Sequence, residues 1–93
     1  MIACAGGRCR LSGPLTIRNA AAVLEEGNRL FSADGIALDL AEVTEVDSAA
    51  VSLLLEWRRG AERRRQRIRF VNLPENLKSL AKLYGFTELL TGG

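Results

Sequence analysis

The chain contains no histidine, and it is poor in other residues that usually mark a catalytic or metal centre. Its 93 residues include two cysteines, two prolines and one tryptophan. Without histidine no histidine-activated nucleophile can be built, and two cysteines alone do not complete a zinc site. A glycine-rich phosphate loop ending in Lys-Ser or Lys-Thr is also missing. We therefore predict a protein that is not an enzyme and that has no metal site, no cofactor and no catalytic residues.

Long apolar runs are missing as well. The longest, Ala20 to Leu24, is far shorter than the roughly 20 residues that cross a bilayer. Met1 to Ala5 is too short for a secretory signal. We therefore expect a cytoplasmic protein without direct membrane insertion. With 47% hydrophobic and 26% charged residues, the chain is expected to form one domain, residues 1–93, around a single core.

The two cysteines flank a turn signal near the N-terminus. Cys4 and Cys9 lie on either side of Gly6-Gly7, so in a hairpin with a two-residue loop they would face each other. Such a pair could be oxidised. In a reducing compartment, however, two thiols that behave as small hydrophobic side chains are the favoured interpretation. We predict a hairpin with two reduced cysteines.

Strand and helix patterns alternate in the first half of the chain. Alternating apolar and polar residues predict a strand after the turn that ends at Gly13-Pro14. A helix capped by Thr16 should follow. A second strand is predicted over residues 36–40, and a loop over residues 41–46. The predicted buried stripe of the helix consists of Ile17, Ala20, Ala21, Leu24 and either Leu30 or Phe31.

The second half repeats this order. A helix is predicted from Asp47-Ser48 to about Arg65, and a strand over residues 68–73. Pro74 suits the start of another helix, and Gly85 its end. Phe86, Leu89 and Leu90 are expected to form a final short turn. The whole is an α/β fold with an N-terminal hairpin, a small sheet with parallel neighbours joined by helices, and three to four helices.

Asp47 and Ser48 are the first candidate site, because they stand at a predicted helix start after a strand. Orphan N–H groups and the positive end of the helix dipole favour an oxygen acceptor or an anion there. One interpretation is a plain helix cap. The other is a residue that contacts a partner or accepts a phosphoryl group at Ser48. The two residues alone do not decide between them.

The helix that follows has more apolar positions than one buried stripe needs. A normal core face is made by Ala50, Leu53, Leu54, Trp57 and Ala61. Val51 and Leu55 fall on an adjacent stripe with Ser48, Ser52 and Arg59. We expect this stripe to be an exposed binding patch with a polar rim. The alternative is that the sheet and neighbouring helices cover both stripes.

Seven arginines lie between Arg58 and Arg69. Cations favour a helix C-terminus, and no aromatic stacking platform is interleaved with these charges. We therefore predict no nucleic-acid partner. A contact with a membrane surface or an acidic protein is the favoured functional alternative.

Several motifs together resemble the STAS domain family. They are Leu11-Ser12-Gly13-Pro14-Leu15-Thr16, Leu38-Asp39-Leu40, Val46-Asp47-Ser48-Ala49-Ala50-Val51, Leu53-Leu54-Leu55 and the strand Ile68 to Leu73. The resemblance covers nearly the whole chain and implies the STAS-like fold of the anti-sigma factor antagonists.

Within that family, Leu80-Ala81-Lys82-Leu83-Tyr84-Gly85-Phe86 is similar to the third helix of the MlaB branch. That likeness implies a subunit that binds and regulates or stabilises the ATPase of an Mla-type phospholipid-transport ABC complex, which also contains a membrane permease. The subunit would be peripheral to the inner membrane through its partner and would help to maintain outer-membrane lipid asymmetry. The alternative is an anti-sigma factor antagonist whose Ser48 is phosphorylated by an anti-sigma factor kinase.

These arguments define one predicted partner-binding surface. Arg58 and Arg59 would border it. Its predicted members are Asp47, Ser48, Ala49, Val51, Ser52, Leu55 and Arg59.

Overall fold

The computed structural model describes residues 1–31 and 33–86. Its elements are β1 (Ile2–Ala5), β2 (Arg8–Leu15), α1 (Ala20–Leu30), β3 (Ile36–Val46), α2 (Ser48–Arg63), β4 (Ile68–Val71) and α3 (Glu75–Leu83). The strands form one sheet in the order β1-β2-β3-β4. β1 pairs antiparallel with β2, and the β2–β3 and β3–β4 pairs are parallel. The predicted α/β fold with an N-terminal hairpin and a mixed sheet is confirmed.

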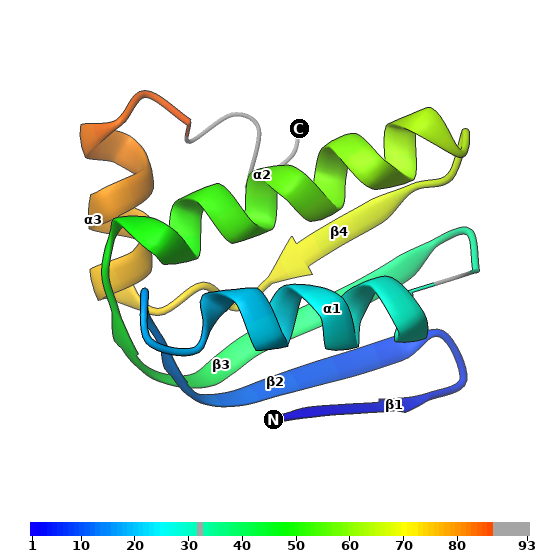
Figure 1. The fold of residues 1–93 in the computed structure, drawn as a ribbon, viewed down its shortest axis with the longest axis horizontal. Coiled ribbons are helices and arrows are strands. Elements are labelled where there is room, and N and C mark those ends of the chain that lie inside the picture. Colours follow the sequence, from blue (N-terminus) through cyan, green and yellow to red (C-terminus); the bar gives the residue numbers. More distant parts are fainter. Residues whose placement is uncertain (32, 87–93) are drawn as a thin grey trace.

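The helices cover one face of the sheet and leave the other open. α1 and α2 run side by side over the strands, and α3 lies at the end where β3 leads into α2 (Figure 1). Along β2, Cys9 and Leu11 are buried, whereas Arg8 and Arg10 are exposed. This alternation places the core between the sheet and the helices. It is continued by Leu38, Leu40, Leu54, Phe70 and Leu77, among others.

Two central strands run further than the sequence indicates. β2 continues through Gly13-Pro14, and β3 continues to Val46, so the predicted loop at residues 41–46 is wrong. The extension is paired, with Gly13 opposite Val43 and Leu15 opposite Val46. Pro14 is tolerated because β1 begins at Ile2, opposite Leu11, which leaves the part of β2 beyond Leu11 without a paired strand on that side.

The hairpin forms as predicted, but its cysteines are not free. Gly6 and Gly7 adopt φ values of +60° and +82°, and a two-residue type I′ hairpin turn requires positive φ at both positions. Cys4 and Cys9 are partners in the β1–β2 register and are joined by a disulfide. The prediction of two reduced thiols is therefore wrong, because the register brings both sulfur atoms within bonding reach.

α1 begins later than the sequence indicates, and Thr16 is not its cap. The helix starts at Ala20 with Asn19 at the N-cap. The Asn19 Oδ1 accepts a hydrogen bond from the backbone N–H of Thr16, and its Nδ2 donates to the Pro14 carbonyl. Ile17 thus belongs to the segment before the helix and is 77% exposed. The buried side of α1 consists of Val23 and Gly27, followed by Phe31 at the C-cap.

α1 and α2 approach each other closely at Gly27 and Trp57. A Cβ atom at position 27 would lie 2.4 Å from ring atoms of Trp57. The Trp57 Nε1–H donates to the carbonyl of Leu24 over 3.2 Å, and the Trp57 ring packs edge-on against Phe31. Glycine at this position therefore sets the spacing of the two helices.

The two helices of the C-terminal half, α2 and α3, have well-defined ends. α2 starts at Ser48 with Asp47 as its cap and passes through Gly60, as predicted. α3 starts after Pro74 and ends before Gly85, whose φ is +76°. The predicted final turn includes Leu89 and Leu90, which lie outside the described residues.

Candidate functional site

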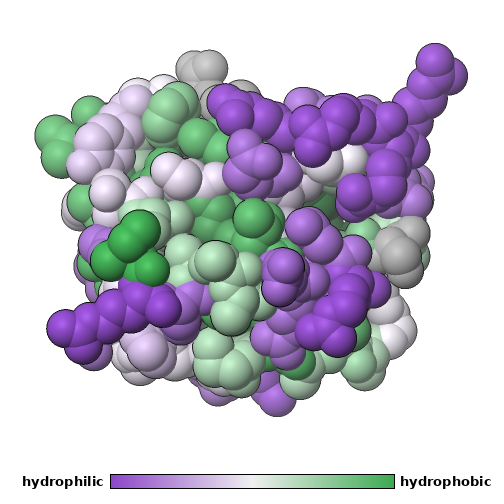
Figure 2. Space-filling view, in the orientation of Figure 1, coloured by the Kyte–Doolittle hydropathy of each residue, from purple (hydrophilic) through white to green (hydrophobic). Residues whose placement is uncertain are grey.

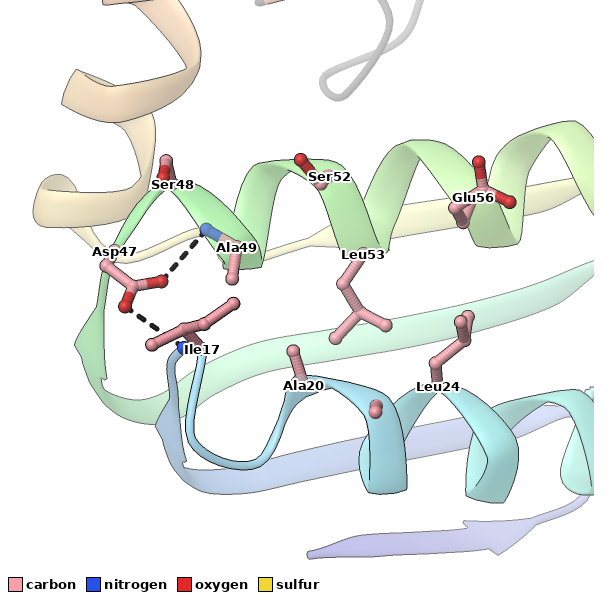
Figure 3. A pocket seen from close by; sticks show the side chains of 10 residues that line it. Ile17, Ala20, Leu24, Asp47, Ser48, Ala49, Ser52, Leu53 and Glu56 are labelled. Carbon is pink, nitrogen blue, oxygen red and sulfur yellow. Dashed lines mark hydrogen bonds between the residues drawn. The ribbon is translucent and has the colours of Figure 1, made fainter.

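Asp47 uses both carboxylate oxygens at the start of α2. Its Oδ1 accepts a hydrogen bond from the backbone N–H of Ala49 over 2.9 Å, which caps the helix. Its Oδ2 accepts from the backbone N–H of Ile17 over 3.0 Å, 30 positions earlier in the chain. Figure 3 shows both bonds. Asp47 therefore caps α2 and also holds the segment that precedes α1 against it.

Ser48 is the first residue of α2, and its side chain is exposed. Ser52 and Glu56 follow at intervals of four and are also exposed. In Figure 3 these three side chains lie on one side of α2, whereas Ala49 and Leu53 point toward α1. Ser48 thus begins a polar ridge along the outer surface of the helix.

A groove of about 500 Å³ lies between this ridge and α1. Its floor is apolar and its edge is polar. Figure 2 shows the apolar surface between the two helices, with hydrophilic surface around it. The groove is lined by Ile17, Ala20, Ala21, Leu24, Ala49 and Leu53, with Asp47, Ser48, Ser52 and Glu56 at its polar edge.

The predicted exposed stripe through Val51 and Leu55 is wrong. Val51 is 2% exposed and Leu55 is 7% exposed, and both belong to the core. α3 packs against α2 and contributes Leu77 and Ala81 to the same core. The alternative interpretation is correct: neighbouring elements cover both apolar stripes of α2.

The remaining predicted site residues divide into two groups. Asp47, Ser48, Ala49 and Ser52 lie together along the groove. Arg59 is exposed, pairs with Glu56 over 3.2 Å, and does not line the groove. Whether these residues contact a partner stays a prediction.

The α1 side of the groove was not foreseen as part of the site. Ile17, Ala20, Ala21 and Leu24 were assigned to a buried stripe, yet Ile17 and Ala21 are exposed, and Ala20 and Leu24 only half-buried. One signal for this was present in the sequence. The apolar positions of this segment, like those of α2, outnumber what one core face needs.

The groove has the chemistry of a contact surface. Among residues 1–31 and 33–86, no group of three or more His, Cys, Asp or Glu could hold a metal ion. Glu42 is exposed and pairs with Arg10 over 3.7 Å. No helix among the described residues is long and apolar enough to span a membrane.

An apolar floor with serine hydroxyls at its edge can hold an apolar side chain and orient it by hydrogen bonds.

Comparisons with known proteins agree with the observed fold. The family model described as "Mlab, STAS domain" matches residues 3–91. Among solved structures, the unphosphorylated anti-sigma factor antagonist SpoIIAA is similar with a TM-score of 0.75 and 16% identity, covering 100% of this chain and 86% of that one. A second structure, Mglu, is similar with a TM-score of 0.62 and 25% identity over 81% of this chain, which spans only 19% of Mglu. No curated protein sequence matches the chain.

Proposed function

Because the chain belongs to this MlaB-labelled family of STAS domains, we propose that it is a non-catalytic subunit of an Mla-type phospholipid-transport ABC complex. It binds the cytoplasmic ATPase subunit and regulates or stabilises it, and it is peripheral to the inner membrane through that partner. The family match supports the choice of this branch. The observation that carries a binding role is the groove between α1 and α2.

The groove offers the partner an apolar contact that nothing in the described chain covers. Ile17 is 77% exposed at one end of the floor. An apolar residue that exposed, beside small side chains such as Ala21 and a polar edge, is typical of a protein contact. A volume of about 500 Å³ suits one or two large side chains of a partner, and such buried anchors dominate interface energies.

Asp47 has an indirect role in this proposal. Both of its oxygens are engaged with backbone N–H groups, so it is a positioning residue that keeps Ile17 at the edge of the groove. The direct contacts are assigned to Ile17, Ser48 and Ser52.

Co-purification with the ATPase subunit, followed by titration, tests the proposal. Ser52→Arg and Ile17→Asp place charge in the groove and should each weaken binding more than fivefold, the equivalent of about 1 kcal/mol. Glu62→Arg is the matched control, because Glu62 is exposed on the same helix outside the groove. Wild-type affinity of both groove variants would refute the groove as the contact.

An anti-sigma factor antagonist is the second candidate. Ser48 directly follows the capping aspartate, is exposed, and occupies the first position of α2. A phosphoryl group there would meet the N-terminal end of the helix while adding about two negative charges beside Asp47. Mass spectrometry of the native protein separates the candidates. Stoichiometric phosphate on Ser48 favours the antagonist, and unmodified Ser48 in a complex with the ATPase favours the transport subunit.

A further inference from the structure

Arginines from three segments meet at the end of the molecule opposite Asp47. α2 ends there, β4 begins there, and β2 begins there after the hairpin (Figure 1). The segment at the start of β3 links them: the backbone N–H of Ala37 donates to the Gly7 carbonyl, and the N–H of Gly35 donates to the Arg67 carbonyl. We call this surface the arginine end. Its members are Arg8, Arg63, Arg64, Arg65, Arg67 and Arg69.

Two of these arginines have a structural task. The Arg64 Nη2 donates to the Phe31 carbonyl and so joins the ends of α2 and α1. Arg67 pairs with Asp34 over 3.2 Å, and its hydrogen bonds hold the pKa of that carboxyl below its ordinary value. Asp34 is thus already neutralised by the pair, and Glu62 is the other carboxylate close in sequence.

Arg8 and Arg69 form no ion pair with the described residues, although Arg8 lies close enough to Asp39 to act on it electrostatically. Both pair in register with Ala37, so their side chains share the open face of the sheet. Ala37 lies between them and is only 4% exposed, whereas both arginines are exposed. This fits aliphatic stems that lie over the alanine and guanidinium groups that extend into solvent.

Arg65 occupies a backbone conformation that favours glycine. It follows the C-cap of α2 and has φ +55°, and its N–H donates to the Glu62 carbonyl. Gly85 takes the corresponding place after α3 with φ +76°. In the left-handed region the Cβ of a non-glycine residue crowds the backbone, so the side chain of Arg65 opposes the local backbone preference.

The charge of the chain is therefore divided unevenly. Its net charge is +2, yet six arginines lie at the arginine end, where the nearby carboxylates are Asp34, Glu62 and Asp39, the last within electrostatic reach of Arg8. Elsewhere the acidic residues outnumber the basic ones. Such an uneven distribution of charge orients a protein on a charged surface.

We infer that the arginine end docks on an anionic phospholipid surface. Guanidinium groups form paired hydrogen bonds with phosphate oxygens. Leu30, in the last turn of α1 beside this end, is 40% exposed and adds an apolar contact at headgroup level. The aromatic rings of Phe31 and Trp57 are buried, so neither ring can stack on a nucleic-acid base at the arginine end. In this orientation the end of the groove at Ile17 and Asp47 is the end farther from the bilayer.

Vesicle co-sedimentation tests this inference with the full chain. Vesicles of equal parts phosphatidylcholine and phosphatidylglycerol should bind the protein, vesicles of phosphatidylcholine alone should not, and added salt should weaken binding. Each arginine near an anionic surface changes partitioning about fivefold, so Arg63→Gln, Arg65→Gln and Arg69→Gln together should lower it on the order of a hundredfold.

The matched control removes three exposed charges elsewhere, by Arg18→Gln, Lys78→Gln and Lys82→Gln. It should keep nearly all vesicle binding. Equal loss in both triple variants, or equal binding to both vesicle types, would overturn the inference. So would binding to an RNA oligonucleotide or to polyglutamate without vesicle binding. Should the first triple variant not fold by circular dichroism, the three single variants replace it. The ATPase titration is independent of all these outcomes.

Discussion

Both flanks of α2 carry apolar residues, Val51 and Leu55 on one and Ala49 and Leu53 on the other, but the folded protein covers them differently. On the flank toward α3, Val51 and Leu55 are buried. On the flank toward α1, Ser48 and Ser52 remain exposed above a groove. One flank is covered by other elements of the chain, and the other borders a groove that the described residues leave open. The difference teaches that apolar positions beyond those of one core face indicate a second contact of the helix. They do not say whether that contact is made within the chain or with another molecule.

The largest expected effect tests the buried flank. Leu55→Ala should lower the free energy of unfolding by about 2–5 kcal/mol, because it removes a core side chain and leaves a cavity. Ser52→Ala, three residues away on the other flank, should change it by less than about 0.5 kcal/mol. Urea denaturation of both variants measures the contrast. Equal losses would break the comparison.

The spacing of α1 and α2 comes next. Gly27→Ala places a methyl group against the Trp57 ring, and the overpacking should cost about 1–3 kcal/mol. Gly60→Ala is the matched control within α2, where a new Cβ meets the ends of two flexible side chains, Arg64 at 3.3 Å and Arg63 at 3.9 Å. It should stabilise the protein by up to about 1 kcal/mol. Thermal unfolding measures both changes in stability. A change of the same sign in both variants would contradict this account of Gly27.

Asp47 provides a smaller effect that separates its two bonds. Asp47→Ala removes the cap and the bond to Ile17, and should cost about 0.5–2 kcal/mol. Asp47→Asn can keep the oxygen that accepts from Ala49, but its amide NH2 cannot accept from Ile17. We expect Asn to recover part of the stability while the Ile17 amide exchanges faster with solvent. Hydrogen exchange at that amide is the measurement, and slow exchange in both variants would count against the tether.

The smallest effect is expected at Ser48. Ser48→Ala should leave the free energy of unfolding within about 0.5 kcal/mol of wild type, because the exposed hydroxyl has no structural role in the capping bonds of Asp47. Chemical denaturation checks this directly. A loss above about 1 kcal/mol would make Ser48 a structural residue and would weaken both functional candidates for it.

Local chemistry and periodicity were enough to predict much of this protein. The Gly6-Gly7 turn, the Asp47 cap, the passage of α2 through Gly60 and the stop at Gly85 all depend on backbone preferences of nearby residues. The same holds for the alternation of Cys9 and Leu11 with arginines in β2. The helix start at Asp47 and Ser48 was predicted correctly, because a helix start is visible in a short stretch of sequence. That these residues contact a partner stays a prediction.

Other features depend on contacts between distant segments, and only the tertiary structure decided them. The strand at residues 41–46 exists because β2 pairs with it, and the disulfide because the hairpin register aligns its cysteines. The exposure of Ile17 follows from a bond to a carboxylate 30 positions away. Burial of Val51 and Leu55 needs α3. The sequence by itself determined which surfaces are apolar, because that is a property of each residue; which of them face water depends on what packs against them.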